Sequence, residues 1–371
     1  MKPLDGIKVI DLSTLLPGPL ATLILAEAGA EVIKIERIGG EDMRRTPPFI
    51  DDESLLFAIL NRGKRSIELD IKSKDGYQNI VKLIKSADVV VDQFRPGVMK
   101  RLGLDFKSLI KIKPNIIHCS ITGYGQNGPK KLVAAHDLNY MAESGLLSLA
   151  IEKDGSPAMP NTQIADIAGG SYPAVINILL ALREVEKTGK GKFLDISMTD
   201  NLFPFMWMAL GLTAKNFYSK GGDLQLTGAS PRYGIYETLN KGYIALGALE
   251  EKFWLRFCEV INLPKQFIND SIDPNATKEA IIEVIKNKNT KEWKEILANE
   301  QNICCSIVYS LEEAMKDSQI IERELLSAKM KLGNKEIFPM PTPLAPAWRQ
   351  KKVLKNAPKL GEANSFYMEK S

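Results

Sequence analysis

Residues 7–37 read IKVIDLSTLLPGPLATLILAEAGAEVIKIER, and this stretch decides the fold class. Residues 7–12 form a short apolar run that predicts a buried strand, and Pro17-Gly18-Pro19 is expected to break the chain after it. Residues 20–28 predict a helix, and residues 31–35 predict a second strand. Strand, helix and strand at this spacing form a βαβ unit, whose right-handed crossover implies a parallel sheet.

The same alternation continues beyond this unit. Further strands are predicted at 66–69, 87–91, 116–121 and 193–196, and helices at 76–86, 98–102, 106–110 and 166–186. This order predicts a large doubly wound, Rossmann-like α/β domain over residues 1–215, completed by 325–371. A predicted hairpin at 234–246 and three short helices after it indicate linkers and a smaller α+β domain over 216–324.

Composition excludes several classes of protein. The chain has 371 residues, of which 44% are hydrophobic, enough for two cores, and its net charge of +4 is too small to indicate a nucleic-acid partner. Two histidines and four cysteines without a CxxC pair give no support for a metal site. Neither a signal peptide nor an apolar stretch of about 20 residues is recognised, so we expect a cytoplasmic protein without a membrane partner.

Three side chains are candidates for acid–base or nucleophilic chemistry. His136 follows a glycine-rich loop and stands next to Asp137, where it could equally be a helix cap. Asp166 opens a predicted helix among small residues that leave room for a ligand, although an N-cap role explains it as well. Glu250 ends an apolar strand, and it is of interest only as a partner that orients a histidine. His118, inside a predicted strand, is expected to be a buried structural residue.

Basic residues recur after strands and in loops. Arg37, Arg62, Lys64, Arg65 and Arg95 would meet along one crevice of a parallel sheet, where several cations suit a phosphorylated cofactor. A solvated basic rim is the plainer interpretation from composition alone. The ATP-binding GxxxxGK[ST] motif is missing, and the GxGxxG at 123–128 is followed by Pro129-Lys130-Lys131 instead of an apolar helix start, which predicts a loop and not a dinucleotide site.

Several segments together carry a specific resemblance. They are LDGIKVIDLSTLLPGPLAT, GAEVIKIER, NRGKRSIELD, ADVVVDQFRPGVMKRLGL, SITGYGQNGP, AHDLNYMAESGLLS, ADIAGG, TGKGKFLDISMTD and YETLNKGYIALGALE. In order and spacing, over roughly residues 3–310, they resemble the class III CoA-transferases and α-methylacyl-CoA racemases. The run AHDLNY, residues 135–140, is similar to the GHDxNY of the racemase branch, with Ala135 in place of the glycine.

The resemblance implies a set of roles. His136 and Asp166 would be the two proton-transfer groups of a 2-methylacyl-CoA racemase, Glu250 would orient His136, and the backbone amide of Asp137 would stabilise an enolate. Arg37, Arg62, Lys64 and Arg95 would lie near the CoA. The family also implies an interlocked homodimer whose active site combines the large domain of one chain with the small domain of the other. No cofactor is expected beyond the CoA carried by the substrate.

Two other functions remain open at this point. In a class III CoA-transferase, Asp166 would be a nucleophile that passes through an aspartyl-CoA thioester. A CoA- or nucleotide-binding scaffold without turnover is the alternative from outside the enzymes, and three residues of catalytic type at family positions argue against it.

Overall fold

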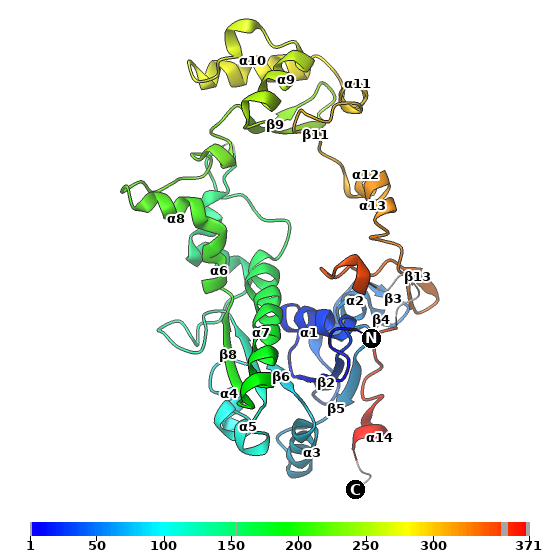
Figure 1. Ribbon diagram of the computed structural model, residues 1–371. Coiled ribbons are helices and arrows are strands. Elements are labelled where there is room, and N and C mark those ends of the chain that lie inside the picture. The colour runs from blue at the N-terminus through cyan, green and yellow to red at the C-terminus, as the bar shows by residue number, and fades with distance from the viewer. Residues whose placement is uncertain (1, 153, 350–354, 369–371) are drawn as a thin grey trace. The chain divides into compact units, whose positions relative to one another are not determined.

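The chain divides into two compact units in the computed structural model, which describes residues 2–152, 154–349 and 355–368 (Figure 1). The first unit comprises Met1–Leu146, Pro160–Phe205 and Ser318–Ser371, and the second comprises Leu147–Met159 and Met206–Asp317. Compared with the boundaries predicted from the sequence, the second unit also takes 147–159 and 206–215, and the first takes 318–324. Each unit has a hydrophobic core of its own.

A six-stranded parallel sheet forms the centre of the first unit, and its strands confirm the predicted α/β class. Val9 pairs with Val32 on one side and with Val89 on the other. The order is β5-β2-β1-β6-β7-β8, so the direction in which strands are added reverses at β1. The strands are β1 (Lys8–Asp11), β2 (Glu31–Glu36), β5 (Arg65–Glu68), β6 (Val89–Asp92), β7 (Ile117–Thr122) and β8 (Lys192–Ser197).

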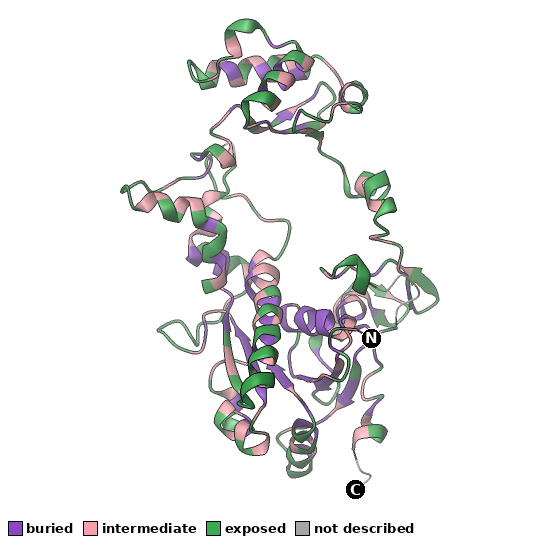
Figure 2. Cartoon of the chain, in the orientation of Figure 1, coloured by how far each residue is buried: buried purple, intermediate pink, exposed green. Residues whose placement is uncertain are grey.

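Helices of this unit belong to two separate hydrophobic clusters, of which the first includes residues of the sheet. Ile10, Ile33 and Val90 contact one cluster with α3 and α5, while α1, α2 and α7 contribute to the other. Figure 2 shows α1 buried along most of its length, which its apolar composition on every side requires. The helices of the first unit are α1 (Pro17–Glu27), η1 (Asp42–Arg45), α2 (Leu55–Asn61), α3 (Lys74–Lys85), α4 (Val98–Arg101), α5 (Phe106–Ile112), α6 (Asp137–Ser144), η3 (Ala165–Ser171), α7 (Tyr172–Thr188), α13 (Ser318–Glu322), η7 (Pro346–Trp348) and α14 (Asn364–Tyr367).

The expectation that Pro17-Gly18-Pro19 breaks the chain is wrong, because these residues form the first turn of α1. Proline is compatible with a first turn, where the missing N–H would have no intrahelical partner. Gly18 is needed for close packing, since a Cβ there would lie 2.1 Å from Cβ of Ser13. The loop after β1 is therefore shorter than predicted, and the helix begins beside it.

The long predicted helix at 166–186 is two elements, η3 followed by α7. Together, Ala165–Thr188 is long and apolar enough to cross a membrane by length and composition, contrary to the expectation of no such segment. Ala174, Ile178 and Ala181 are buried, and α7 packs against β7 and β8. A core helix of a globular protein passes the same test, so the finding is weak evidence for a membrane span.

The second unit is built on a small antiparallel sheet in the order β11-β10-β9. The predicted hairpin is confirmed, with Ile244 opposite Tyr236. Trp254, Phe257 and Trp293 lie in its core. Its elements are α8 (Trp207–Thr213), η5 (Gln225–Thr227), β9 (Tyr233–Glu237), β10 (Tyr243–Gly247), α9 (Glu251–Ile261), η6 (Lys265–Phe267), α10 (Pro274–Lys286), α11 (Thr290–Leu297), β11 (Cys305–Ile307) and α12 (Leu311–Met315).

Short elements complete the chain. They are β3 (Phe49–Ile50), β4 (Glu53–Ser54), η2 (Leu146–Leu149), η4 (Asp200–Met206), β12 (Met330–Leu332) and β13 (Lys335–Ile337).

Candidate active site

The carboxyl ends of the sheet strands border two cavities in the first unit. The smaller, of about 290 Å³, is lined by residues that follow β1, β6, β7 and β8, and it contains both His136 and Asp166. The larger, of about 640 Å³, is lined by residues that follow β1, β2 and β5. Thr14 and Phe94 line both, so the cavities adjoin at the point where the strand order reverses. Ligands of open parallel sheets bind in this position.

Asp166 lies in η3, a wide turn in which the N–H of Tyr172 bonds to the carbonyl of Ile167, five residues earlier. Such π-helical turns occur frequently at functional sites. Gly169 allows the turn to press against the residue after β8, because a Cβ there would lie 2.5 Å from the carbonyl oxygen of Met198. The two glycines of the ADIAGG segment therefore allow the turn to pack closely against its neighbours, and this packing sets the position of Asp166 at the cavity.

The carboxyl group of Asp166 has a strongly raised pKa. Burial, together with the neighbouring charge of Asp137, raises its pKa from 3.8 to about 7. Asp137 begins α6, and its Oδ1 accepts a 2.9 Å hydrogen bond from the backbone N–H of Asp166. Burial also raises the pKa of the Asp137 carboxyl. The structure thus brings the two predicted aspartates into direct contact.

His136 lines the same cavity and is exposed, in the N-cap position of α6. Its backbone N–H donates to Oδ1 of Asn139 at 3.0 Å, which fixes the start of the helix. The hydroxyl of Tyr140 donates to the carbonyl of Ala135 at 2.7 Å, and this bond holds the preceding loop. The N–H of Asp137 belongs to the first turn, where helical amides have no intrahelical partner and are available to an anion.

Two of the four predicted cofactor-binding cations line the cavities. Arg95 follows β6 and lines the smaller cavity. Arg37 follows β2 and lines the larger one, where its guanidinium also donates to the carbonyl of Gly40 at 3.0 Å and pairs with Asp42. Both cations are thus available at the carboxyl edge of the sheet.

The other two cations are committed to partners inside the protein. The ammonium of Lys64 is buried against Asp11, Thr22, Asn61 and the carbonyl of Pro19, and burial lowers its pKa to about 8. Such a saturated group has no donor left for a phosphate. Arg62 is likewise buried, and its guanidinium bonds to Glu27 and to backbone carbonyls. The expectation that Arg62 and Lys64 contact CoA finds no support in this geometry.

Glu250 lies in the second unit. It follows β10 as the N-cap residue of α9, and it is exposed. His118, by contrast, is buried in β7 as predicted, and its Nε2 lies 2.7 Å from Oδ2 of Asp92. Asp92 in turn accepts from the N–H of Phe94 at 3.0 Å, so this pair supports the loop that carries Arg95.

Sequence reasoning missed part of the cavity lining. Thr14, Gln93, Tyr124 and Lys131 all line the smaller cavity. Their signal was their position directly after strands or in the loop that contains GYGQNGP, a segment interpreted only as a loop. Among the residues that the structure describes, no group of His, Cys, Asp and Glu side chains is arranged to hold a metal ion.

Comparison with known proteins gives two groups of enzymes. Succinyl-CoA:glutarate CoA-transferase from Mus musculus is 36% identical over 271 residues, 71% of this chain and 61% of the relative. α-Methylacyl-CoA racemase from Mus musculus is 31% identical over 369 residues, 97% of this chain and 91% of the relative. The chain spans about three fifths of the length of the glutarate CoA-transferases from mouse and human, at 61% and 63%.

The solved structure of Rv3272 from Mycobacterium tuberculosis, in its orthorhombic form, superimposes with a TM-score of 0.85 at 27% identity. The match covers 100% of this chain and 99% of that one. The sequence model of CoA-transferase family III matches residues 4–364. The chain therefore belongs to CoA-transferase family III, whose members include both racemases and CoA-transferases.

Proposed function

We propose that the protein is a 2-methylacyl-CoA racemase or epimerase that interconverts the R and S thioesters by 1,1-proton transfer through an enolate. The observation that carries this proposal is the pairing in one cavity of His136 with an aspartate whose pKa is raised to about 7. A histidine and an aspartate of this kind suit the removal of a proton and the return of another near neutral pH.

The chemistry follows from the weak acidity of the hydrogen α to a thioester carbonyl. One of the two groups, Asp166 or His136, takes this proton, and the electron pair moves onto the carbonyl oxygen as an enolate. The N–H of Asp137, at the start of α6, is the donor proposed for that oxygen. The other group then gives a proton to the opposite face of the same carbon, which inverts the centre with no net change in composition. No cofactor is needed beyond the CoA of the substrate.

The adjoining cavities suit a long substrate. A thioester that reaches Asp166 and His136 in the smaller cavity would place its remaining length past Thr14 and Phe94 toward the larger one. Arg95 and Arg37 are the cations proposed for its phosphates, one at each cavity. The strand order also supports the predicted doubly wound, Rossmann-like arrangement, in which the site lies at the reversal point.

A CoA-transferase is the second candidate, because relatives of comparable identity carry that activity. In this alternative Asp166 attacks the thioester carbonyl, CoA leaves as the thiolate, and an acyl-aspartyl anhydride forms. The thiolate then attacks the aspartyl carbonyl, which releases the carboxylate and leaves an aspartyl-CoA thioester for the acceptor acid. Trapping by hydroxylamine at Asp166 would support this alternative over racemisation.

We further propose that the protein acts as an interlocked homodimer in the cytoplasm, in which Glu250 orients the imidazole of His136. Exposed apolar side chains on the outer face of α7 support the proposal that a second chain packs there. Ile176, Leu179 and Leu180 are 56%, 44% and 64% exposed on that face. Apolar side chains grouped in this way mark protein contacts more often than solvent-facing helix. Sedimentation of the purified chain at twice the monomer mass is the expected result.

The deciding experiment is α-proton exchange in D₂O with a 2-methylacyl-CoA and no acceptor acid. Deuterium at C2 together with loss of optical purity would support the racemase. Without incorporation, transfer of CoA to an added carboxylic acid would overturn the racemase and support the transferase.

A further inference from the structure

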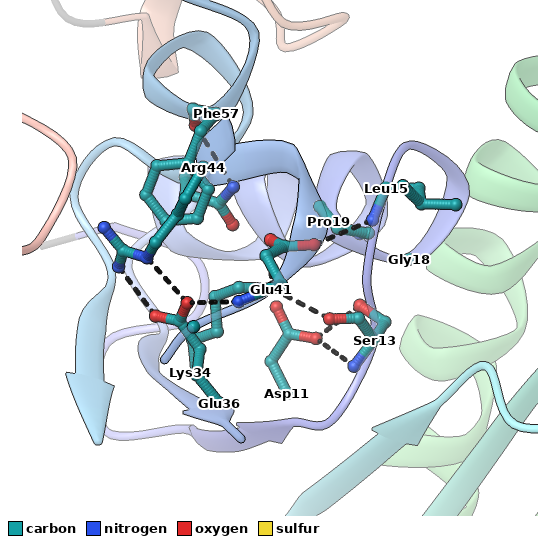
Figure 3. Close-up of polar contacts among 12 residues, drawn as sticks. Asp11, Ser13, Leu15, Gly18, Pro19, Lys34, Glu36, Glu41, Arg44 and Phe57 are labelled. Carbon is teal, nitrogen blue, oxygen red and sulfur yellow. Dashed lines mark hydrogen bonds and ion pairs between the residues drawn. The ribbon is translucent and has the colours of Figure 1, made fainter. Parts of the chain in front are cut away.

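Beside the segment that follows β1 lies a cluster of charged side chains, of which all but the half-buried Arg44 are buried (Figure 3). Its ion pairs are Lys34–Glu41 at 2.9 Å, Arg44–Glu36 at 2.7 Å and Lys64–Asp11 at 3.1 Å. Three positive charges thus balance three negative ones. Burial of a charge is costly unless it is paired and hydrogen-bonded, so such a cluster persists only where its partners, the backbone included, are held in place.

The pair Lys34–Glu41 holds the backbone on both sides of Thr14. The ammonium of Lys34 donates to the carbonyl oxygen of Ser13 at 2.8 Å. Oε2 of Glu41 accepts from the N–H of Leu15 at 2.9 Å, while Oε1 of the same carboxylate pairs with Lys34. The side chains of Lys34 and Glu41 are only 0% and 2% exposed, so water does not compete for these bonds. One buried ion pair therefore fixes the turn formed by residues 13–15.

This turn has a conformation that its residues do not favour by themselves. Leu15 has a φ of +63°, in the left-handed region that residues with a Cβ seldom adopt. Such conformations persist where the surroundings determine them, and they cluster at functional sites. The carboxylate of Glu41 supplies the acceptor that this conformation of Leu15 requires.

The turn is also where the two cavities adjoin. Thr14 lines both of them, and Leu15 lines the smaller one with His136 and Asp166. We infer that Glu41 is a positioning residue for acyl-CoA, which acts through the backbone of Leu15 to hold Thr14 against the ligand. This inference rests on the proposed acyl-CoA function. Glu41 also lines the larger cavity, but it does not line the smaller one that contains His136 and Asp166.

The test uses the full-length protein with CoA alone as the probe. Glu41→Ala removes the acceptor, whereas Glu41→Gln removes the charge and keeps an oxygen for the Leu15 amide. Asp270→Asn is the matched control, since it breaks another enclosed pair, with Arg232 at 2.7 Å in the second unit. Affinity is measured by calorimetry, the exchange of the Leu15 amide by mass spectrometry, and unfolding by urea.

We expect Glu41→Ala to bind CoA roughly tenfold more weakly and to exchange the Leu15 amide faster, as the loss of one charged hydrogen bond implies. Glu41→Gln should stay within about threefold of the unchanged protein, and Asp270→Asn should bind CoA normally even where it unfolds more easily. A merely structural role would lower the stability of Glu41→Ala without changing affinity.

Two results for the Glu41 variants would overturn the inference. If Glu41→Ala bound CoA as tightly as the unchanged protein, or if Glu41→Gln and Glu41→Ala lost affinity equally, the backbone acceptor would not be what positions the ligand. If the unchanged protein showed no affinity for CoA, the proposed function would fail first, and the positioning role would fall with it. The affinity of the unchanged protein therefore distinguishes the two failures.

Discussion

Oδ1 of Asp137 accepts a 2.9 Å hydrogen bond from the backbone N–H of Asp166, 29 residues further along the chain. The bond ties the first residue of α6 to the wide turn of η3, and it brings the carboxyl group of Asp137 near Asp166, which lines the smaller cavity. Proximity of like charges, added to burial, keeps Asp166 protonated to a higher pH than usual. Asp137 therefore affects Asp166 electrostatically, apart from the backbone-donor role that the family resemblance implies for it.

Replacement of this neighbouring charge should shift the pH dependence of the reaction. Asp137→Asn retains an oxygen for the Asp166 amide but removes the charge, so the pKa of Asp166 should fall. If Asp166 acts as a base, the acidic limb of the kcat/KM profile for proton exchange moves to lower pH. Asp154→Asn, at an exposed acid, is the control and should leave the profile unchanged. If the profile of Asp137→Asn were not shifted, the proposed electrostatic effect of Asp137 on Asp166 would be contradicted.

The titration of Asp166 should also make the fold less stable as the pH rises from about 4 to above 7. Its pKa is raised from 3.8 to about 7 on folding, so its favourable contribution is complete below about pH 4 and is lost as the pH rises through 7. Asp166→Asn does not titrate. Relative to the unchanged protein, its free energy of unfolding should therefore rise by about 1–3 kcal/mol between pH 4 and pH 8, allowing for partial exposure. Urea titrations at the two pH values measure these free energies of unfolding. If the difference between Asp166→Asn and the unchanged protein were the same at both pH values, the prediction would be contradicted.

Loss of the exposed histidine should stop proton exchange. His136→Ala removes one of the two groups in the cavity, and we expect exchange with D₂O to slow by at least about 100-fold. Lys130→Ala, on the same loop and exposed, is the control and should exchange normally. Full-rate exchange on both faces by His136→Ala would exclude it as a catalytic residue.

Two glycines on helices, Gly169 and Gly211, offer a matched test of packing. Gly169→Ala forces a Cβ to within 2.5 Å of the carbonyl of Met198, and should destabilise the protein by about 1–3 kcal/mol while displacing Asp166. Gly211 in α8 has open space around it, so Gly211→Ala should be neutral or stabilising by up to about 1 kcal/mol. Thermal unfolding and exchange rates separate the two variants, and similar behaviour would refute the packing argument.

Much of the architecture was predictable, because several strands of the large sheet, such as β1, β2 and β6, are largely buried and rich in apolar residues. β6 and β7 are buried throughout, and their predicted bounds are close to those observed. The first turn of α1 was not predictable by the same means, since Pro17-Gly18-Pro19 is equally typical of a loop. The wide turn at Asp166 depends on packing against Pro17 and Met198, which are distant in sequence.

The basic residues show the same limit. Arg37 and Lys64 look alike in the sequence, yet one lines a cavity and the other is enclosed by Asp11, Thr22 and Asn61. Which cation is available to a ligand depends on partners up to 53 residues away, and no local pattern records those partners.

Because Thr14 and Phe94 line both cavities, the proposed substrate would be bound mainly in one cavity and would react in the other. The nucleotide part of CoA, bound in the larger cavity over β5, β2 and β1, would supply binding energy far from the α-carbon that loses its proton. That binding energy can hold the thioester in line with its proton acceptor. A truncated acyl-pantetheine, which lacks the nucleotide part, should then react slowly even at saturation. If the acyl-pantetheine reacted at saturation as fast as the full acyl-CoA, the nucleotide part would contribute to substrate binding alone and not to the rate of the chemical step.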